Sequence, residues 1–257
     1  MIDKMFGICN LANIPLRFEP NDRSELVSQV LFGEHFQIID QNSKWSKIRL
    51  AFDHYEGWVD NKQFQFITAQ QYECLKNADL FLNGDLMEYI TSPDNTLIPI
   101  PLGAALSFLS ISDINVENYQ FEGLKVSGQK SKAEIINTAF MYLNSPYLWG
   151  GKTPFGIDCS GFTQMVYKLN GYKLLRDASQ QATQGDPLSF IEESEPGDLA
   201  FFDNEEGNII HVGIIMENNY IIHASGKVRI DRLDHLGIYN AELNKHTHKL
   251  RVIKKIV

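Results

Sequence analysis

One cysteine and two histidines are spaced as the groups of a nucleophilic active site would be. Cys159 follows the glycine-rich run "GGKTPFGID" and opens the run "CSGFTQMVYKLNG", which reads as a helix. A cysteine in the first turn of a helix lies where free backbone N–H groups favour negative charge, so we expect a lowered pKa and a thiolate. The position equally suits a small buried residue, because free cysteine is among the most buried residue types.

The histidines favour the nucleophile. His211 lies in "IIHVGII" and His223 lies 12 residues later in "YIIHAS", both apolar runs typical of buried strands. We expect a hairpin through "ENN" to place the two side by side on one face. A buried histidine is costly unless it has a partner. With a thiol on the covering helix, the pair would supply a base and a group that orients it. The other five histidines lie in polar contexts and are expected at the surface.

A zinc site is the alternative use of the same residues. Cys159, His211 and His223 are of the types that ligate zinc, but the sequence holds no short-spaced motif such as CxxC beside them. Cys9 and Cys74 complete an odd, widely spaced set of three cysteines, which argues against a disulfide framework. We therefore expect reduced thiols and a reaction that needs no metal or organic cofactor.

Residues 124–257 carry the pattern of an α+β domain. "SKAEIINTAFMYLNS" has apolar residues at helical spacing, with Ser131 and Glu134 placed as a capping box. A second helix starts at Cys159 and is closed by Gly171. Four strand-like runs follow: "DLAFFD", "IIHVGIIME", "NYIIHAS" and "KLRVIKKIV". Helices followed by a meander predict helices packed on an antiparallel sheet, with the last run as a closing edge strand.

The first 123 residues read as one small β domain and a connector. "HFQIIDQ", "WSKIRLAF" and "EGWVDNKQFQFI" alternate apolar and polar residues, so residues 1–67 predict a small barrel, with a sandwich fragment as the alternative. Residues 68–123 predict a connector and an incomplete second barrel: residues 68–90 have helical spacing interrupted by Asn83-Gly84, and "NTLIPIPLGAALSFLSI" gives two strand-like runs. This segment holds eight acidic residues and one basic residue, as a solvated face would.

Composition narrows the class of partner. The 257 residues allow two small domains, and no apolar run approaches the roughly 20 residues that cross a bilayer. The N-terminal residues show no secretory signal, so we expect a cytoplasmic protein that does not bind membranes. A net charge of -9 without a large basic patch makes nucleic acid an unlikely partner.

Six motifs in order give a specific resemblance: "YLWGG", "DCSGF", "RDASQQ", "PGDLAFF", "HVGII" and "IIHAS". Over residues 128–257 the chain resembles the NlpC-type family of bacterial cell-wall cysteine peptidases, papain-like enzymes that cut peptidoglycan stem peptides. The resemblance implies a papain-like catalytic domain of α+β class, preceded by a small SH3-like β-barrel. It also implies that Cys159 is the nucleophile, His211 the general base and His223 the group that orients the base.

The front of the chain adds a narrower resemblance. "SELVSQVLFGE" and "YEGWV" are similar to the bacterial SH3-like domain of members that recycle muropeptides. Such members cleave the bond between γ-D-glutamate and the diamino acid and need a free N-terminal L-alanine. The resemblance places recognition of that amine, and the lining of its pocket, on Asp158, Ser160, Glu34, Tyr55, Ser179 and Trp149.

An ammonium in a closed pocket needs a carboxylate and acceptor oxygens, which agrees with this set, although Asp158 equally suits a helix cap. Several questions stay open at this point. The diamino acid is lysine or diaminopimelate, and the oligomeric state, with a monomer plausible, is undetermined. There are two alternative functions. The same residues could carry out amidase or acyltransferase chemistry, or the protein could bind the cell wall without catalysis.

Overall fold

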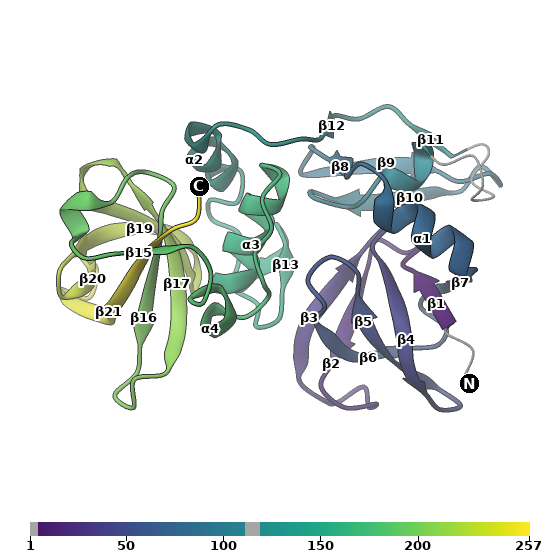
Figure 1. Ribbon diagram of the computed structural model, residues 1–257, viewed down its shortest axis with the longest axis horizontal. Coiled ribbons are helices and arrows are strands. Elements are labelled where there is room, and N and C mark those ends of the chain that lie inside the picture. Colours follow the sequence, from purple (N-terminus) through teal and green to yellow (C-terminus); the bar gives the residue numbers. More distant parts are fainter. Residues whose placement is uncertain (1–4, 111–118) are drawn as a thin grey trace. The chain divides into compact units, whose positions relative to one another are not determined.

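The chain forms two compact units, Met1–Gly128 and Gln129–Val257. The computed structural model describes residues 5–110 and 119–257 (Figure 1). The N-terminal unit holds two hydrophobic cores, and the C-terminal unit carries the cysteine and the histidines singled out above.

The N-terminal unit begins with a seven-stranded antiparallel sheet in the order β3-β2-β6-β5-β4-β1-β7. Alternate residues of each strand point into the first core, where Ile14, Leu16 and Ile48 are fully buried. Two of the predicted strands are confirmed, and the third predicted run divides into β6 and β7. The strands are β1 (Met5–Ile8), β2 (Asn13–Arg17), β3 (Leu26–Leu31), β4 (His35–Gln41), β5 (Trp45–Leu50), β6 (Glu56–Asp60) and β7 (Gln65–Ile67).

The second half of this unit is only partly helical. The helical spacing of residues 68–90 gives α1 (Ala69–Asn77), and the chain then forms short strands around a turn. The buried side-chain amide of Asn83 donates to the carbonyl oxygens of Asp85, Ile100 and Pro101, which holds that turn. The elements after α1 are β8 (Leu82–Asn83), β9 (Met87–Thr91), β10 (Leu97–Pro101), η1 (Ser107–Ser110), β11 (Gln120–Phe121) and β12 (Lys125–Val126).

The two strand-like runs predicted after residue 95 have different outcomes. The first contains β10, which pairs with β9. Within the second, residues 107–110 form the 3₁₀ turn η1 instead of a strand, and its last residue, 111, lies outside the described residues.

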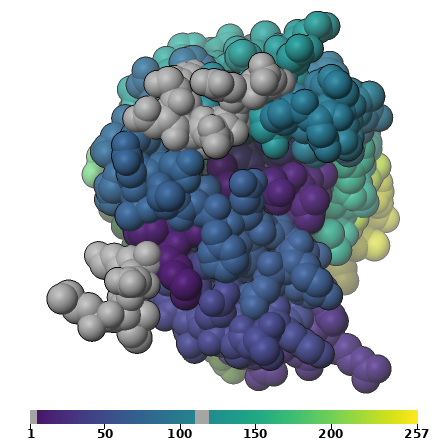
Figure 2. Space-filling view, turned by 90° about the vertical axis from the view of Figure 1, so that its right-hand side faces the viewer, coloured from purple at the N-terminus to yellow at the C-terminus, as the bar shows by residue number. Residues whose placement is uncertain are grey.

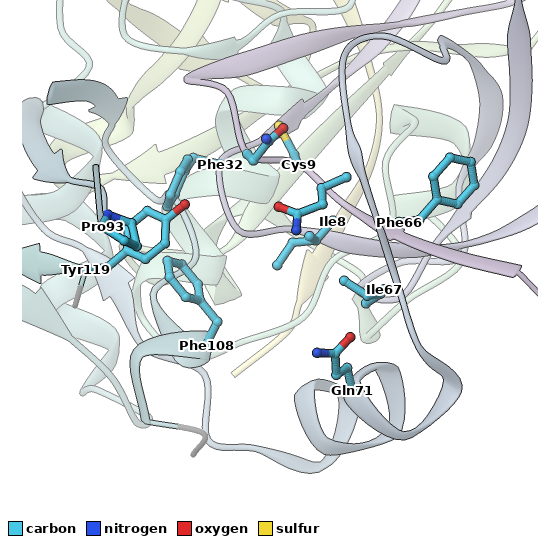
Figure 3. Close-up of a pocket in the computed structure, with 11 residues that line it drawn as sticks. Ile8, Cys9, Phe32, Phe66, Ile67, Gln71, Pro93, Phe108 and Tyr119 are labelled. Atoms are coloured by element: carbon cyan, nitrogen blue, oxygen red, sulfur yellow. The ribbon is translucent and has the colours of Figure 1, made fainter. Parts of the chain in front are cut away.

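A cavity of about 180 Å³ lies within the N-terminal unit. Figure 3 shows Phe32, Phe108 and Tyr119 grouped on one side of it and Ile67 and Gln71 on the other. Figure 2 shows a face of this unit where purple atoms of the first strand are visible between the blue and teal atoms of later segments. The walls of this cavity come from both hydrophobic cores of the unit.

The C-terminal unit is built on a barrel. Strands run in the order β15-β21-β16-β17-β18-β19-β20, and β21 also pairs with β20, so β16 to β21 close on themselves. The predicted antiparallel meander is confirmed, but the prediction of an edge strand at the C-terminal run is wrong, because β21 lies between β15 and β16. The strands are β15 (Asp186–Leu188), β16 (Leu199–Asp203), β17 (Ile209–Met216), β18 (Tyr220–Ser225), β19 (Lys227–Asp234), β20 (Gly237–Asn240) and β21 (Lys245–Lys255).

Helices cover one side of this barrel, so the α+β expectation is confirmed in part. α3 packs on β17 and β18, α4 packs on β17, and α2 packs on α3. The continuous apolar runs of β16 and β17 are buried because they have the barrel core on one face and helices on the other. The remaining elements are α2 (Lys132–Phe140), β13 (Lys152–Thr153), β14 (Gly156–Ile157), α3 (Cys159–Leu169), α4 (Ala178–Gln181), η2 (Ile191–Glu193) and η3 (Glu217–Asn219).

The helix ends differ from the prediction in one detail. Ser131 is the N-cap of α2, but within the described residues its side chain makes no cap hydrogen bond, so the predicted capping box does not form. Gly171 follows α3 with a φ of 81°, in the left-handed region that closes helices, as predicted. Among the described residues, no helix has the length and apolar character needed to cross a membrane.

Candidate active site

Asp158 and the glycine-rich turn place Cys159 at the first position of α3. One oxygen of Asp158 accepts from the backbone N–H of Gly161 at 2.6 Å, and the other accepts from that of Gly150 at 2.8 Å. A Cβ atom on Gly161 would lie 2.3 Å from the carbonyl oxygen of Gly151, so only glycine lets the turn and the helix approach this closely. The sequence therefore fixes the cysteine by a capped helix and a tight backbone turn.

The Cys159 thiol is neutral in this setting. The residue is 7% exposed, and burial raises the pKa of its thiol to about 12, with the nearby charge of Asp158 acting in the same direction. Backbone hydrogen bonds from Val212 and Ser160 lower it, but burial outweighs them. The expectation of a thiolate is therefore wrong. The contact with Val212 also places the sulfur beside β17, at the residue that follows His211.

The β17–β18 hairpin brings the two histidines together. Gly213 of β17 pairs with His223 of β18, so His211, two residues along, lies diagonally opposite His223 on the same face. Nε2 of His211 is 2.8 Å from Nδ1 of His223, and both rings are buried. A Cβ atom on Gly213 would lie 2.8 Å from the Cβ atom of His223. Glycine at 213 is therefore needed to hold this pair.

The sequence analysis missed a carboxylate behind the histidines. Nε2 of His223 lies 3.0 Å from Oδ2 of Asp231 in β19, and Arg229 donates to both oxygens of that carboxylate. Arg229 also contacts Glu242 at 3.2 Å. The run "KVRIDRLD" looks like an ordinary strand with solvated charges, so only its pairing with β18 reveals the role of Asp231.

A third histidine stacks on His211. The rings of His248 in β21 and His211 are 4.2 Å apart at 27°, and His248 is half-buried, so its predicted surface position is wrong. Burial lowers the pKa of His248 to about 4, and the neighbouring His223 acts in the same direction. Burial, His223 and His248 likewise hold the pKa of His211 well below its ordinary value. All of these rings are therefore neutral near pH 7.

Arg176 ties two predicted substrate residues together. Its guanidinium donates to both oxygens of Asp158, at 3.0 and 2.7 Å, and to Oγ of Ser160 at 2.9 Å. The side chain of Arg176 is only 1% exposed. The motif "RDASQQ" contains this arginine, but nothing in that string identified it as the partner of Asp158.

The other predicted residues of the C-terminal unit are more exposed. Trp149, which immediately precedes the glycine-rich turn, is 60% exposed, and Ser179 in α4 is exposed. Tyr147 lies near Cys159: burial raises the pKa of its phenol to about 12, and Cys159 and Asp158 act in the same direction.

Glu34 and Tyr55 belong to the N-terminal unit. Glu34 is 6% exposed, and its carboxylate accepts from the backbone N–H of Leu31 at 2.8 Å. Tyr55 precedes β6 and packs against the first hydrophobic core. The described residues contain no group of three or more side chains suited to hold a metal ion.

Comparison with known proteins agrees with this geometry. The model of the NlpC/P60 family matches residues 144–249, and that of the bacterial dipeptidyl-peptidase Sh3 domain matches residues 16–64. A gamma-D-glutamyl-L-lysine dipeptidyl-peptidase of Bacillus subtilis (strain 168) is 32% identical over 77% of this chain and 71% of its own length. Dipeptidyl-peptidase 6 of Lysinibacillus sphaericus is 28% identical over 88% of this chain and 90% of its own.

The fold has a solved counterpart. The crystal structure of an NlpC/P60 family protein from Bacillus cereus ATCC 10987 matches with a TM-score of 0.81 at 19% identity, covering 98% of this chain and 99% of that one. Fold, site and relatives together define a cell-wall cysteine peptidase with an SH3 domain. The chain belongs to the NlpC/P60 family.

Proposed function

We propose that this peptidase cleaves the bond between γ-D-glutamate and the diamino acid in peptidoglycan stem peptides that have a free N-terminal L-alanine. The names of its relatives and the SH3 domain of the dipeptidyl-peptidase type support this substrate. The observation that supports the chemistry is the buried His211–His223 pair, because His211 lies on β17, the strand whose Val212 also contacts the Cys159 thiol.

The reaction begins from a neutral thiol and a neutral imidazole. His211 takes the thiol proton while the sulfur of Cys159 attacks the γ-carbonyl carbon of D-glutamate. The carbonyl oxygen becomes an oxyanion that accepts from a backbone N–H at the start of α3. The C–N bond then breaks as His211 returns the proton to the amine of the diamino acid. Water, deprotonated by His211, then attacks the thioester carbonyl, the C–S bond breaks, His211 returns the proton to the sulfur of Cys159, and L-Ala-γ-D-Glu leaves.

Recognition of the alanine amine is assigned to Asp158 and Ser160 beside the nucleophile. The Ser160 hydroxyl accepts from Arg176 at 2.9 Å, but its own donation to Asp158 is long, at 3.4 Å, so a substrate ammonium displaces this second contact at the least cost. Arg176 keeps the carboxylate of Asp158 oriented while the substrate ammonium replaces the Ser160 hydroxyl. Glu34, Tyr55, Ser179 and Trp149 join this assignment on the family resemblance alone.

The requirement for a free amine implies the source of the substrate. In the intact wall the alanine nitrogen is acylated, so a peptidase that needs this amine acts on stem peptides already released from the glycan. Such peptides arise during recycling of the wall, and a cytoplasmic location belongs to the same proposal.

Mass spectrometry of the products tests the proposal. The substrates are L-Ala-γ-D-Glu-L-Lys, its diaminopimelate counterpart and the N-acetylated form of each, with Cys159→Ala as the inactive control. We expect release of L-Ala-γ-D-Glu from the free peptides only, and the faster of the two identifies the diamino acid. Equal cleavage of the acetylated peptides would remove the roles given to Asp158 and Ser160. Products joined to an added amine would instead indicate an acyltransferase.

A further inference from the structure

Asp231 ends a buried chain of hydrogen-bonded groups that reaches the proposed base. Its Oδ2 lies 3.0 Å from Nε2 of His223, and Nδ1 of His223 lies 2.8 Å from Nε2 of His211. The three residues are at most 6% exposed, so water does not substitute freely for either contact. A neutral imidazole has one donor and one acceptor nitrogen, so the position of a proton at one end fixes the protons along the whole chain.

The carboxylate end of this chain is ionised and can only accept. Nε of Arg229 donates to Oδ2 of Asp231 at 2.7 Å, and a second guanidinium nitrogen donates to Oδ1 at 3.0 Å. Burial opposes ionisation, but the hydrogen bonds from His223 and Arg229 hold the pKa of Asp231 below its ordinary value. Nε2 of His223 must therefore be the donor in its contact with Asp231.

The remaining protons follow from this donor. Burial keeps His223 neutral, so its single proton lies on Nε2 and its Nδ1 accepts. The 2.8 Å contact therefore takes its proton from Nε2 of His211. His211 is neutral as well, which leaves its Nδ1 as the bare nitrogen and the one available to Cys159.

We infer that Asp231 is a positioning residue that fixes, through His223, the tautomer of His211 in which Nδ1 accepts the thiol proton. This inference rests on the proposed role of His211 as the base. In the opposite tautomer, Nδ1 of His211 would carry a hydrogen and could not take a proton from Cys159. Besides each other, the charged and titratable groups that act on the two rings are His248, Asp231 and Arg229.

Nuclear magnetic resonance of the unaltered chain tests the inference directly. Histidine is labelled with ¹⁵N, and long-range ¹H–¹⁵N spectra at pH 7 report which ring nitrogen carries the proton. We expect the proton on Nε2 in both His211 and His223. A proton on Nδ1 of His211 would overturn the inference, and this result needs neither a substrate nor a variant.

Asp231→Asn tests the consequence for catalysis, with Asp234→Asn as its matched control. Asp234 lies on the same strand and contacts the exposed His246 at 2.9 Å, so the control removes the same charge away from the site. An amide at 231 presents an N–H donor as well as an acceptor and no longer selects one tautomer. We expect kcat to fall by about 10²–10⁴-fold with KM little changed, whereas Asp234→Asn keeps the kcat of the unaltered chain. Unchanged kcat in Asp231→Asn would overturn the inference.

Site-resolved alkylation of Cys159 by iodoacetamide separates this inference from the proposed function. If the unaltered chain cleaves no stem peptide, the proposed substrate is wrong, but the ring tautomers and the alkylation rates still decide the role of Asp231. We expect alkylation of Cys159 to slow in Asp231→Asn and to be unaffected in Asp234→Asn. Equal alkylation rates in all three proteins would contradict the positioning role.

Discussion

Two buried carboxylates of the C-terminal unit look alike but organise different things. Asp158 and Asp231 are each 6% exposed, and each is held by two hydrogen bonds from an arginine. Asp158 also accepts from backbone N–H groups of the turn and the helix and, at 3.4 Å, from the Ser160 hydroxyl, whereas Asp231 contacts a histidine ring. The first pair therefore fixes the position of Cys159, the proposed nucleophile, and we infer that the second fixes which nitrogens of the two histidine rings carry protons.

The surroundings of the two arginines differ as well. The Arg176 side chain is 1% exposed, while that of Arg229 is 17% exposed and also contacts the exposed Glu242. Breaking a fully buried ion pair leaves an uncompensated charge, but water reaches a partly exposed one. Loss of the arginine should therefore be more damaging at Asp158 than at Asp231.

Replacing each arginine tests this difference and should give the largest effect. We expect Arg176→Met to lower the free energy of unfolding by about 3–5 kcal/mol, because Asp158 keeps a buried charge without its cation. Arg229→Met should cost only about 1–2 kcal/mol, because Asp231 keeps His223 and gains water. Urea denaturation at pH 7.5 measures both, and equal losses would show that the two pairs have the same structural role.

Gly213→Ala should displace the His211–His223 pair without altering Asp231 itself. The new Cβ would lie 2.8 Å from the Cβ atom of His223, so the β17–β18 hairpin must shift. We expect a loss of about 1–3 kcal/mol in stability, together with a lower kcat because the His211–His223 contact lengthens.

Gly57→Ala is the matched control for that substitution. Gly57 is also a strand glycine, and its Cβ would lie 2.6 Å from Cγ of Leu16 in the N-terminal unit. Gly57→Ala should lower stability by a similar amount and leave kcat unchanged. A fall in kcat in both variants would mean that crowding in a strand, and not displacement of His223, lowers the activity.

Lowering the pH should reduce the free energy of unfolding through the titration of His248, by less than the substitutions above. The pKa of His248 is lowered from its ordinary value of 6.5 to about 4 in the folded chain. Below pH 6.5 the unfolded chain therefore binds more protons at this residue than the folded chain does. This contribution to stability is complete above pH 6.5 and is lost as the pH falls to about 4. His248→Phe keeps an aromatic ring against His211 and removes the titration.

Urea denaturation between pH 7.5 and pH 4.5 measures this contribution. We expect a shallower fall in stability for His248→Phe than for the unaltered chain. His246→Phe is the control, because His246 is exposed and contacts Asp234. Parallel curves for all three proteins would show that the buried position of His248 does not affect acid stability.

Local patterns predicted the parts of the site that depend on neighbours in sequence. The capped helix start at Cys159 and the hairpin that joins His211 and His223 follow from residues close together in the chain. Asp231 and His248 reach the site only through strand pairing: β19 pairs with β18, and β21 pairs with β16 and closes the barrel. Alternating charged runs give no sign of that closure, so β21 looked like an edge.

The predicted direction of the pKa shift of Cys159 was wrong for a different reason. A helix start favours the thiolate, but the sequence does not say how completely the surrounding elements bury the sulfur. All residues of α3 are buried, and desolvation then decides the direction. Arg176 was missed for a related reason, since its partnership with Asp158 spans 18 residues and a turn between two helices.

The neutral thiol also bears on the durability of the enzyme. Peroxide attacks the thiolate of cysteine and converts it first to sulfenic acid and then to forms that thiols do not restore. A cysteine that is 7% exposed, with the pKa of its thiol raised to about 12, presents almost no thiolate to such oxidants between turnovers. In the proposed mechanism His211 removes the proton only during attack on a substrate, so the proposed nucleophile would react when a substrate is bound and resist oxidation at other times.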